Sequence, residues 1–277
     1  MNPTPTQPVS VNVVIPVYKP QLTPYEQIAL TQCMRVLGHY PVVLAAPQSL
    51  DLTAYRALYP NLTVRTFDDR YFANIQSYNQ LMLSTVFYEA FTDQTYMLIY
   101  QLDAFVFQDD LADWCSRGYD YIGAPWLRDC DFSGWRDEAW FNLKKQAATL
   151  LDLKKTDGVT PREIVSQNAV GNGGFSLRRV PSMLQVLGRF RRKIAQYEQN
   201  HTYHFNEDAF WGIEVNRYWP QLRIPSFRTA LRFSVEFFPE RAVDYYNQGQ
   251  LPFGCHAWDI HGTAYWRPIF ARYGYQI

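Results

Sequence analysis

A glutamine and an aspartate interrupt an otherwise apolar stretch in the middle of the chain, Tyr96 to Phe107. A run of this kind is typical of a strand that is buried on both faces of a parallel sheet. Burying a carboxylate without a partner is costly, so we expect Asp103 at the end of the strand, facing a partner such as a metal ion. Ligands of open α/β sheets bind just outside the carboxyl ends of the strands, which makes Asp103 a candidate active-site residue. The alternative is an aspartate that caps the next turn.

Three further groups have residue types that suit a functional site. The glycines of segment 171–174 (Gly-Asn-Gly-Gly) would let the backbone approach a ligand closely, although a plain turn or bulge uses the same residues. Glu207 and Asp208 suit a general base in a partly aromatic cleft, or a solvent-facing helix N-terminus capped by Asn206. His256 lies among aromatic residues, where a lone histidine is more often a hydrogen-bonding group of the core than a metal ligand.

Strands and helices are predicted to alternate along the first half of the chain. Apolar and β-branched runs predict strands at 11–18, 41–46, 62–67, 96–107 and 119–124. Helices are expected between them, at 23–37, 51–59, 74–91 and 109–117. The first helix opens with a capping box formed by Thr23 and Glu26. This alternation implies an α/β fold with a mostly parallel, doubly wound sheet.

The pattern weakens between Pro125 and about Gln167, where charged residues mix with tryptophans. We interpret this segment as an inserted loop or helical flap, and ordered insertions of this size are often functional. Beyond it, residues 170–178 predict a strand that is entered through a glycine-rich turn, and residues 181–197 predict a helix.

Composition narrows the functional classes. Lys plus Arg and Asp plus Glu both number 26, and the absence of a net basic charge argues against non-specific nucleic-acid binding. No apolar run approaches the roughly 20 residues that a transmembrane helix needs. The four cysteines are scattered without a CxxC pair, as expected for reduced thiols in a cytoplasmic protein. The aromatic content of 17% fits an aromatic core or sugar binding, because pyranose C–H faces pack on aromatic rings.

The order of these motifs resembles that of the GT-A class of nucleotide-sugar-dependent glycosyltransferases. More closely, the chain resembles a glycosyltransferase-like domain family formerly of unknown function. The matching segments lie between Val11 and Trp266 and are YQLDAFVF, DYIGAPW, VGNGGFSLR, NEDAFWG and FGCHAW. The resemblance implies a GT-A-like, Rossmann-type sheet that is mostly parallel and flanked by helices, with a flap inserted around 125–167.

The resemblance also implies a division of the chain. Residues 11–277 would form a single domain, whereas residues 1–10 are expected to form a flexible N-terminal tail because they are rich in Pro, Thr and Gln. Within that domain, residues 11–124 would form the nucleotide-binding half, and residues 125–277 would contain the flap, the acceptor site and the catalytic residues.

By the same resemblance, the chain would bind a nucleotide-diphosphate sugar as donor. The residues expected to bind it are Pro16, Tyr18, Lys19, Tyr78, Asn79, Gln101, Asp103, Gly173 and Gly174. A divalent metal, Mn²⁺ or Mg²⁺, is expected on Asp103 and His256. The family pattern has Asp-x-Asp where this chain has Gln101-Leu102-Asp103, so metal binding is expected to be weaker or optional.

The implied reaction is an inverting single displacement, of the kind used in polysaccharide biosynthesis. Asp208 would take the proton of an acceptor hydroxyl, and Glu207 would bind sugar hydroxyls. A glycan acceptor is expected against Trp126, Trp135 and Trp211. Two alternatives stay open, a non-catalytic carbohydrate-binding domain on a degenerate transferase fold and a nucleotidyltransferase. The second has no Gly-rich, Lys-containing phosphate loop after the first strand to support it.

Overall fold

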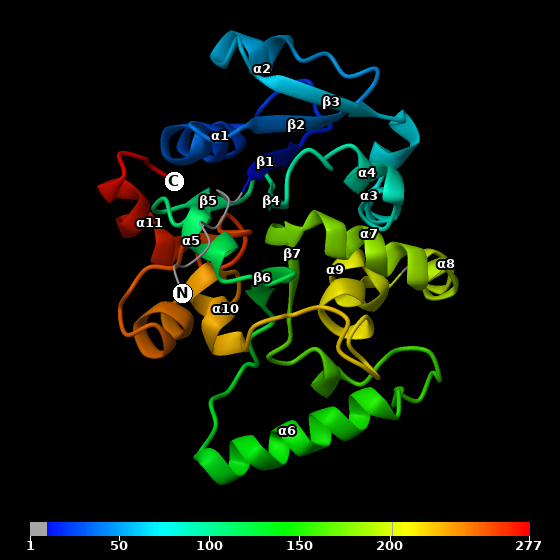
Figure 1. Cartoon of the computed structure of the whole chain (residues 1–277). Helices are drawn as coiled ribbons and strands as arrows, with labels where there is room; N and C mark the ends of the chain where they lie inside the picture. Colours follow the sequence, from blue (N-terminus) through cyan, green and yellow to red (C-terminus); the bar gives the residue numbers. More distant parts are fainter. Residues whose placement is uncertain (1–9, 201) are drawn as a thin grey trace, which may run out of the picture.

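The computed structural model describes residues 10–200 and 202–277, so the predicted tail lies almost wholly outside the described residues. A six-stranded sheet forms the centre of the fold, in the order β3-β2-β1-β4-β7-β6 (Figure 1). Its strands are β1 (Val11–Pro16), β2 (Val42–Pro47), β3 (Thr63–Phe67), β4 (Tyr96–Tyr100), β6 (Tyr121–Pro125) and β7 (Val170–Arg179). Strands β3, β2, β1 and β4 are parallel, whereas β7 runs antiparallel to both of its neighbours. The predicted mostly parallel α/β sheet is therefore confirmed, with one antiparallel strand inside it.

Helices cover both faces of this sheet (Figure 1). One core cluster includes residues of α1 (Pro24–Leu37), α2 (Thr53–Leu58), α5 (Leu111–Ser116) and α10 (Phe227–Phe233). A second includes residues of α3 (Ile75–Met82), α4 (Thr85–Glu89), α7 (Val180–Arg189), α8 (Arg191–Glu198) and α9 (Glu207–Ala209). Strand residues alternate between the clusters, with Val13 in the first and Val14 in the second. Both faces of each central strand are therefore apolar, which explains the uninterrupted apolar runs in the sequence.

The predicted strand 96–107 is wrong in its extent. It ends at Tyr100, and a turn follows in which the Ala104 amide donates to the Gln101 carbonyl oxygen at 2.9 Å. The chain then enters a small second sheet of β5 (Phe105–Val106), β9 (Gly254–Cys255) and β8 (Ser234–Val235). This sheet and α11 (Thr263–Arg272) enclose a third apolar cluster.

Two of the predicted helices are each divided in two. The expected helix at 74–91 breaks at Leu83, because Ser84 accepts the Phe87 amide and so starts α4 as a new N-cap. The expected helix at 181–197 breaks at Phe190, which ends α7 and precedes α8. By contrast, the capping box of Thr23 and Glu26 is present at the start of α1.

The predicted insertion contains one long helix, α6 (Trp135–Leu150), which Figure 1 shows at the lower end of the molecule, away from the central sheet. The inner side of α6 buries Phe141 and Ala148. Polar contacts fix it further, because Lys145 donates to the Gln167 carbonyl oxygen at 2.7 Å and Arg228 pairs with Glu138 at 2.8 Å. The insertion is therefore an ordered, helical part of the fold.

All four cysteines are free thiols, and Cys130 is exposed. Within residues 10–200 and 202–277, the helices are all too short or too polar to cross a bilayer.

Candidate functional site

The strand order brings distant motifs to one edge of the sheet. Strands β1 and β4 are parallel neighbours, so the residues that follow them leave the sheet at the same edge. Because β7 is antiparallel, its first half lies at that edge as well. The Gln101 amide donates to the Gly174 carbonyl oxygen at 2.8 Å. Residues about 70 positions apart in the sequence thus become direct neighbours.

A cavity of about 770 Å³ opens at this edge. Every residue predicted to bind the donor, to hold the metal or to act in catalysis lines it: Pro16, Tyr18, Lys19, Tyr78, Asn79, Gln101, Asp103, Gly173, Gly174, Glu207, Asp208 and His256. The structure thus brings these residues together around one cavity, and the roles assigned to them stay predictions.

A chain of polar side chains crosses the floor of the cavity. The side-chain amide nitrogen of Gln101 donates to the Tyr78 hydroxyl at 3.3 Å, and Oε1 of Gln101 lies 3.2 Å from Nε2 of His256. Oδ1 of Asp103 lies 3.1 Å from the same nitrogen, and Oε1 of Glu236 lies 3.8 Å from Nδ1. His256 is thus held between a carboxylate on each side, and burial alone would have lowered its pKa. The charge of Asp103, followed by the Glu236 interaction, instead raises the pKa of His256 to about 10.

The donor atoms around His256 are of the type that a divalent ion binds. Oδ1 of Asp103 is buried, and apart from its ion pair with His256 it has no hydrogen-bond partner in the described part of the chain. Once Nε2 of His256 has lost its proton, that nitrogen and the side-chain carbonyl oxygen of Gln101 would join this carboxylate oxygen as a donor set that suits Mg²⁺ or Mn²⁺. Among residues 10–200 and 202–277, no group of three or more His, Cys, Asp or Glu side chains could hold a metal ion. Such an ion would therefore need ligand oxygens from a substrate.

The glycines of β7 make room for functional side chains. A Cβ at Gly173 would overlap the Glu207 carboxylate, one at Gly174 the His256 ring, and one at Gly171 the ring of Trp126. None of these glycines has a positive φ, and all lie within β7. The predicted glycine-rich turn is therefore wrong, whereas the alternative of a bulge agrees with the register shifts in the pairing of β6 and β7 across this stretch. Close approach of neighbouring side chains explains why glycines lie there.

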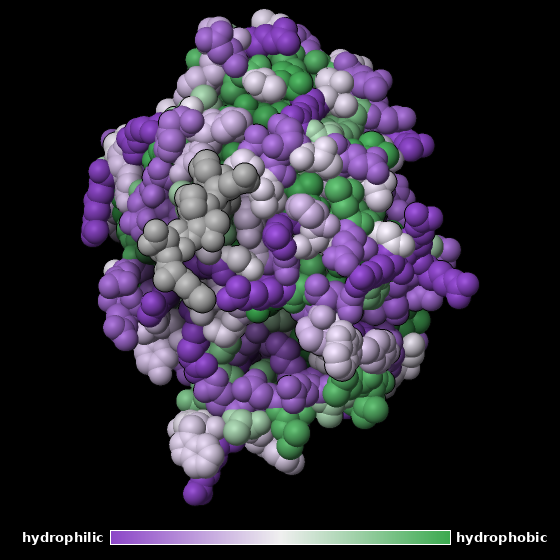
Figure 2. All heavy atoms as spheres, in the orientation of Figure 1, coloured by the Kyte–Doolittle hydropathy of each residue, from purple (hydrophilic) through white to green (hydrophobic). Residues whose placement is uncertain are grey.

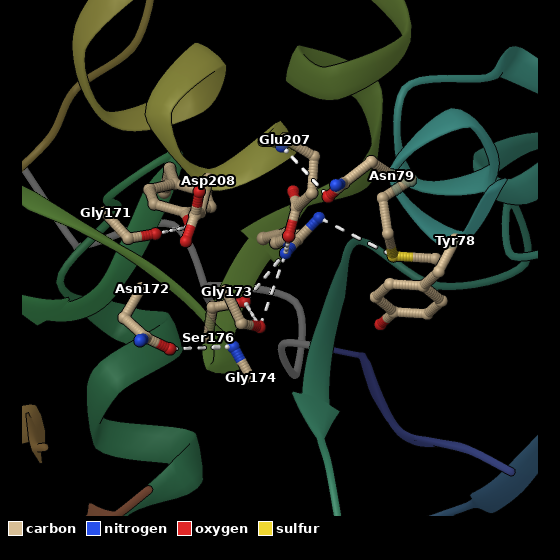
Figure 3. A network of polar contacts seen from close by, with 12 residues as sticks. Tyr78, Asn79, Gly171, Asn172, Gly173, Gly174, Ser176, Glu207 and Asp208 are labelled. Atoms are coloured by element: carbon tan, nitrogen blue, oxygen red, sulfur yellow. Dashed lines mark hydrogen bonds and ion pairs between the residues drawn. The ribbon is translucent and has the colours of Figure 1, made fainter. Parts of the chain in front are cut away.

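A buried ion pair joins β7 to the short helix α9. Arg178 is fully buried, and its Nη2 lies 2.9 Å from Oε1 of Glu207. The other guanidinium nitrogens donate to the Tyr88 hydroxyl at 2.8 Å and to the Ser176 hydroxyl at 3.0 Å. Glu207 is therefore buried against Arg178, and the alternative in which both carboxylates face solvent is wrong for Glu207. Figure 3 shows Glu207 and Asp208 pointing from α9 towards the glycines of β7.

The pKa of the Asp208 carboxyl group departs strongly from its ordinary value. Burial, followed by the negative charge of the adjacent Glu207, raises the pKa of Asp208 to about 8. One of its oxygens accepts the Ala209 amide at 2.7 Å. A carboxylate with a raised pKa is a stronger base than an ordinary one, as a general base requires.

A second cavity, of about 450 Å³, meets the first at α9. Asn206 and Asp208 line both cavities. The second cavity has aromatic side chains in its wall, namely Trp126, Tyr203, Phe237 and Phe238. Its other walls include segments 126–129 and 161–167 of the insertion.

Of the three tryptophans predicted to contact an acceptor, only Trp126 lines this second cavity. Trp135 is 73% exposed on α6 and lines neither cavity, and Trp211 is fully buried in the core. The structure gives no support to acceptor contacts from Trp135 or Trp211. Residue type alone could not separate a core tryptophan from one in a cavity.

Several contacts of the site were not predicted. Asn172 donates to Glu236 and accepts the Gly174 amide at 3.1 Å, so it links β7 to the segment beside His256. Asn79, predicted to reach the donor, instead donates to Asn206 at 2.9 Å and accepts the Glu207 amide at 3.1 Å. The contact of Asn172 with Glu236 and the two contacts of Asn79 span 64 to 128 residues of sequence, and no local pattern indicates them.

The fold has a counterpart among solved structures. The crystal structure of mouse xyloside xylosyltransferase 1, in its apo form, matches with a TM-score of 0.51 over 90% of this chain and 97% of that chain. Sequence identity is 12%, so the match concerns the fold alone. The chain therefore has a GT-A-like fold, as the resemblance of its sequence motifs implied.

The family model described as "Protein of unknown function (DUF5672)" matches residues 61–256. The chain belongs to this family. A comparison with curated proteins gives no match.

We expect Gly174→Ala to destabilise the protein, because its Cβ would occupy the space of the His256 ring. Overpacking of this kind costs about 1–3 kcal/mol of unfolding free energy. The matched control is Gly188→Ala, because Gly188 lies in α7 with open space around it and alanine there should stabilise by about 0.5–1 kcal/mol. Urea unfolding measures both variants, and equal stability of the two would contradict the proposed role of Gly174.

We expect Glu207→Gln to lower the unfolding free energy by about 3–5 kcal/mol, because it leaves the buried Arg178 charge uncompensated. The control is Asp113→Asn, which breaks an exposed ion pair with Arg117 and should cost less than about 1 kcal/mol. Chemical denaturation of both variants tests this, and a loss below about 1 kcal/mol for Glu207→Gln would show that Arg178 finds another partner.

Proposed function

We propose that the chain is an inverting glycosyltransferase that moves a sugar from a nucleotide-diphosphate donor to a hydroxyl group of a glycan acceptor. The observation that carries this proposal is the position of Asp208, which lines both cavities. A general base for glycosyl transfer must lie between the two substrates, because it has to reach the acceptor hydroxyl while the donor sugar is bound next to that hydroxyl. Asp208 meets this requirement in position and in acidity.

The first cavity is assigned to the donor. It lies outside the carboxyl ends of β1 and β4, where open α/β sheets bind nucleotides. Tyr18 and Lys19 at its rim are proposed to contact the base and ribose, and Lys19 is fixed by an ion pair with Glu26 at 2.9 Å. Gly173 and Gly174 would lie beside the donor sugar.

The second cavity is assigned to the acceptor. Its aromatic wall suits the C–H faces of a sugar ring, and Trp126 is the predicted acceptor residue that lies there. The other predicted acceptor residues, Trp135 and Trp211, are not part of this proposal.

The reaction follows from this arrangement as a single displacement. Asp208 takes the proton of the acceptor hydroxyl while that oxygen forms a bond to the anomeric carbon of the donor sugar. The bond from the anomeric carbon to the diphosphate oxygen breaks, and its electron pair leaves with the nucleoside diphosphate. Glu207 is held by Arg178, and it keeps α9 and therefore Asp208 in place.

Asp103 and His256 are the residues proposed to hold a divalent ion, with the side-chain carbonyl oxygen of Gln101 beside them. When bound, Mg²⁺ or Mn²⁺ offsets the negative charge of the departing diphosphate. The burial of His256 and its position between two carboxylates keep the imidazole ring fixed at the cavity floor.

We expect Asp208→Asn to lower the transfer rate by a factor of at least about 100, since the amide cannot accept the acceptor proton. Donor binding should persist, because the change removes no group proposed to contact the nucleotide. Release of nucleoside diphosphate from a panel of nucleotide sugars measures the rate, and calorimetry measures donor binding. Asp113→Asn, an exposed change on α5, is the handling control.

The pH profile of the unmodified enzyme is a second check of this base. Asp208 acts as a carboxylate, so kcat/KM should rise with pH and level off above about pH 8, where the raised pKa leaves the group ionised. Full activity in Asp208→Asn, or a profile that is flat down to pH 5, would remove Asp208 from the mechanism.

We expect Asp103→Ala to weaken nucleoside diphosphate binding by at least about tenfold when Mn²⁺ or Mg²⁺ is present, because it removes a proposed metal ligand. With a chelator present, the same variant and the unmodified protein should bind the nucleotide with similar affinity. Calorimetric titrations under both conditions decide this. An equal loss in the presence of the chelator would mean that Asp103 acts without a metal ion.

A further inference from the structure

The outer side of α6 exposes large apolar side chains. Trp140, Leu143 and Leu150 are 57%, 56% and 51% exposed, and with Ala147 they follow a three-four-three spacing. At 3.6 residues per turn this spacing places them in one stripe, opposite the buried Phe141 and Ala148. The flanking Trp135 and Leu151 are also exposed, by 73% and 70%. In Figure 2, hydrophobic and near-neutral residues stand out along the lower edge of the molecule, where Figure 1 places α6.

Cations accompany the tryptophans of this outer face. Arg136 stacks at 5.3 Å from the centroid of the Trp135 ring, and Lys144 lies 5.0 Å from that of Trp140. Neither cation forms an ion pair with any residue in 10–200 or 202–277. Of the acids of the helix, Glu138 pairs with Arg228, whereas Asp137 is half-buried and accepts the Ser133 amide at 3.0 Å. The exposed face of α6 is therefore both apolar and positively charged.

We propose that this face binds a membrane surface that carries anionic lipid headgroups. Tryptophan and leucine side chains insert at the boundary between headgroups and acyl chains, and neighbouring cations attract the anionic headgroups. A second copy of the chain is a poorer fit, since it would bring Arg136 and Lys144 against their own counterparts, and Glu138, one of the two acids of α6, is already paired with Arg228. The helix lies along the surface in this proposal and does not cross the bilayer.

The position of α6 determines which part of the protein would face the membrane. Segments 126–129 and 161–167, on either side of the helix in the sequence, form part of the wall of the second cavity. A membrane bound to α6 therefore contacts the same insertion that borders this cavity. The proposal itself rests on the exposed face alone and holds whatever reaction the site performs.

Flotation of the full chain with lipid vesicles tests the proposal. We expect binding to phosphatidylcholine vesicles that contain phosphatidylserine, and weaker binding to phosphatidylcholine alone. The double variant Trp140→Ser/Leu143→Ser should lower binding by at least about tenfold, because both side chains leave the interface. Arg136→Gln and Lys144→Gln should each lower binding about fivefold, and only on the anionic vesicles.

Val86→Ser is the matched control, because Val86 is 51% exposed on α4 and should bind as the unmodified protein does. All the substituted side chains are exposed, and thermal unfolding checks that each variant is folded. Three results would overturn the proposal: no binding of the unmodified protein to anionic vesicles, equal binding of the double variant, or a dimer in sedimentation that the double variant converts to a monomer.

Discussion

The buried pair of Arg178 and Glu207 is the interaction on which the site depends. An arginine with no exposed surface is tolerated only because a carboxylate, two hydroxyl groups and a backbone carbonyl oxygen surround it. The pair fixes the first turn of α9 against β7, and that turn also carries Asp208. Glu207 thereby has two effects: its contact with Arg178 positions α9, and its charge helps to raise the pKa of Asp208.

The same constraint explains the composition of β7. A strand that must face a carboxylate, an imidazole and an indole ring on one stretch of backbone has no room for Cβ atoms there. Glycine is usually unfavourable within strands because it has no side chain to pack. Here a neighbouring side chain occupies the space that the Cβ of each glycine would fill. Asn172 is the non-glycine residue among them, and its amide side chain joins Glu236 to the Gly174 backbone. The site is thus assembled by side chains that converge on one bare length of strand.

Much of this arrangement was predictable from local patterns. The cost of burying Asp103 placed it at a strand end, and the alternation of strands with helices placed that end beside β1. Local patterns failed where long-range packing decides the outcome. The glycines of β7 looked like a turn because the side chains they accommodate come from Trp126, Glu207 and His256. Trp211 looked like a binding residue because burial in the core leaves no mark on its sequence neighbours.

The second half of β7, residues 175–179, is paired with β4 on one side, and residues 177 and 178 are also paired with β6 on the other. A strand paired in this way opens only when the sheet itself unfolds, so its amides should be among the slowest to exchange. Segment 172–174, which lines the cavity, directly precedes this firmly paired half and lies outside the pairing with β4. The other walls of the two cavities include segments outside the sheet, namely the loop between β1 and α1 at the rim and the insertion that carries α6. The candidate site is therefore anchored to a rigid stretch of sheet but is built largely from segments that the sheet pairing does not hold.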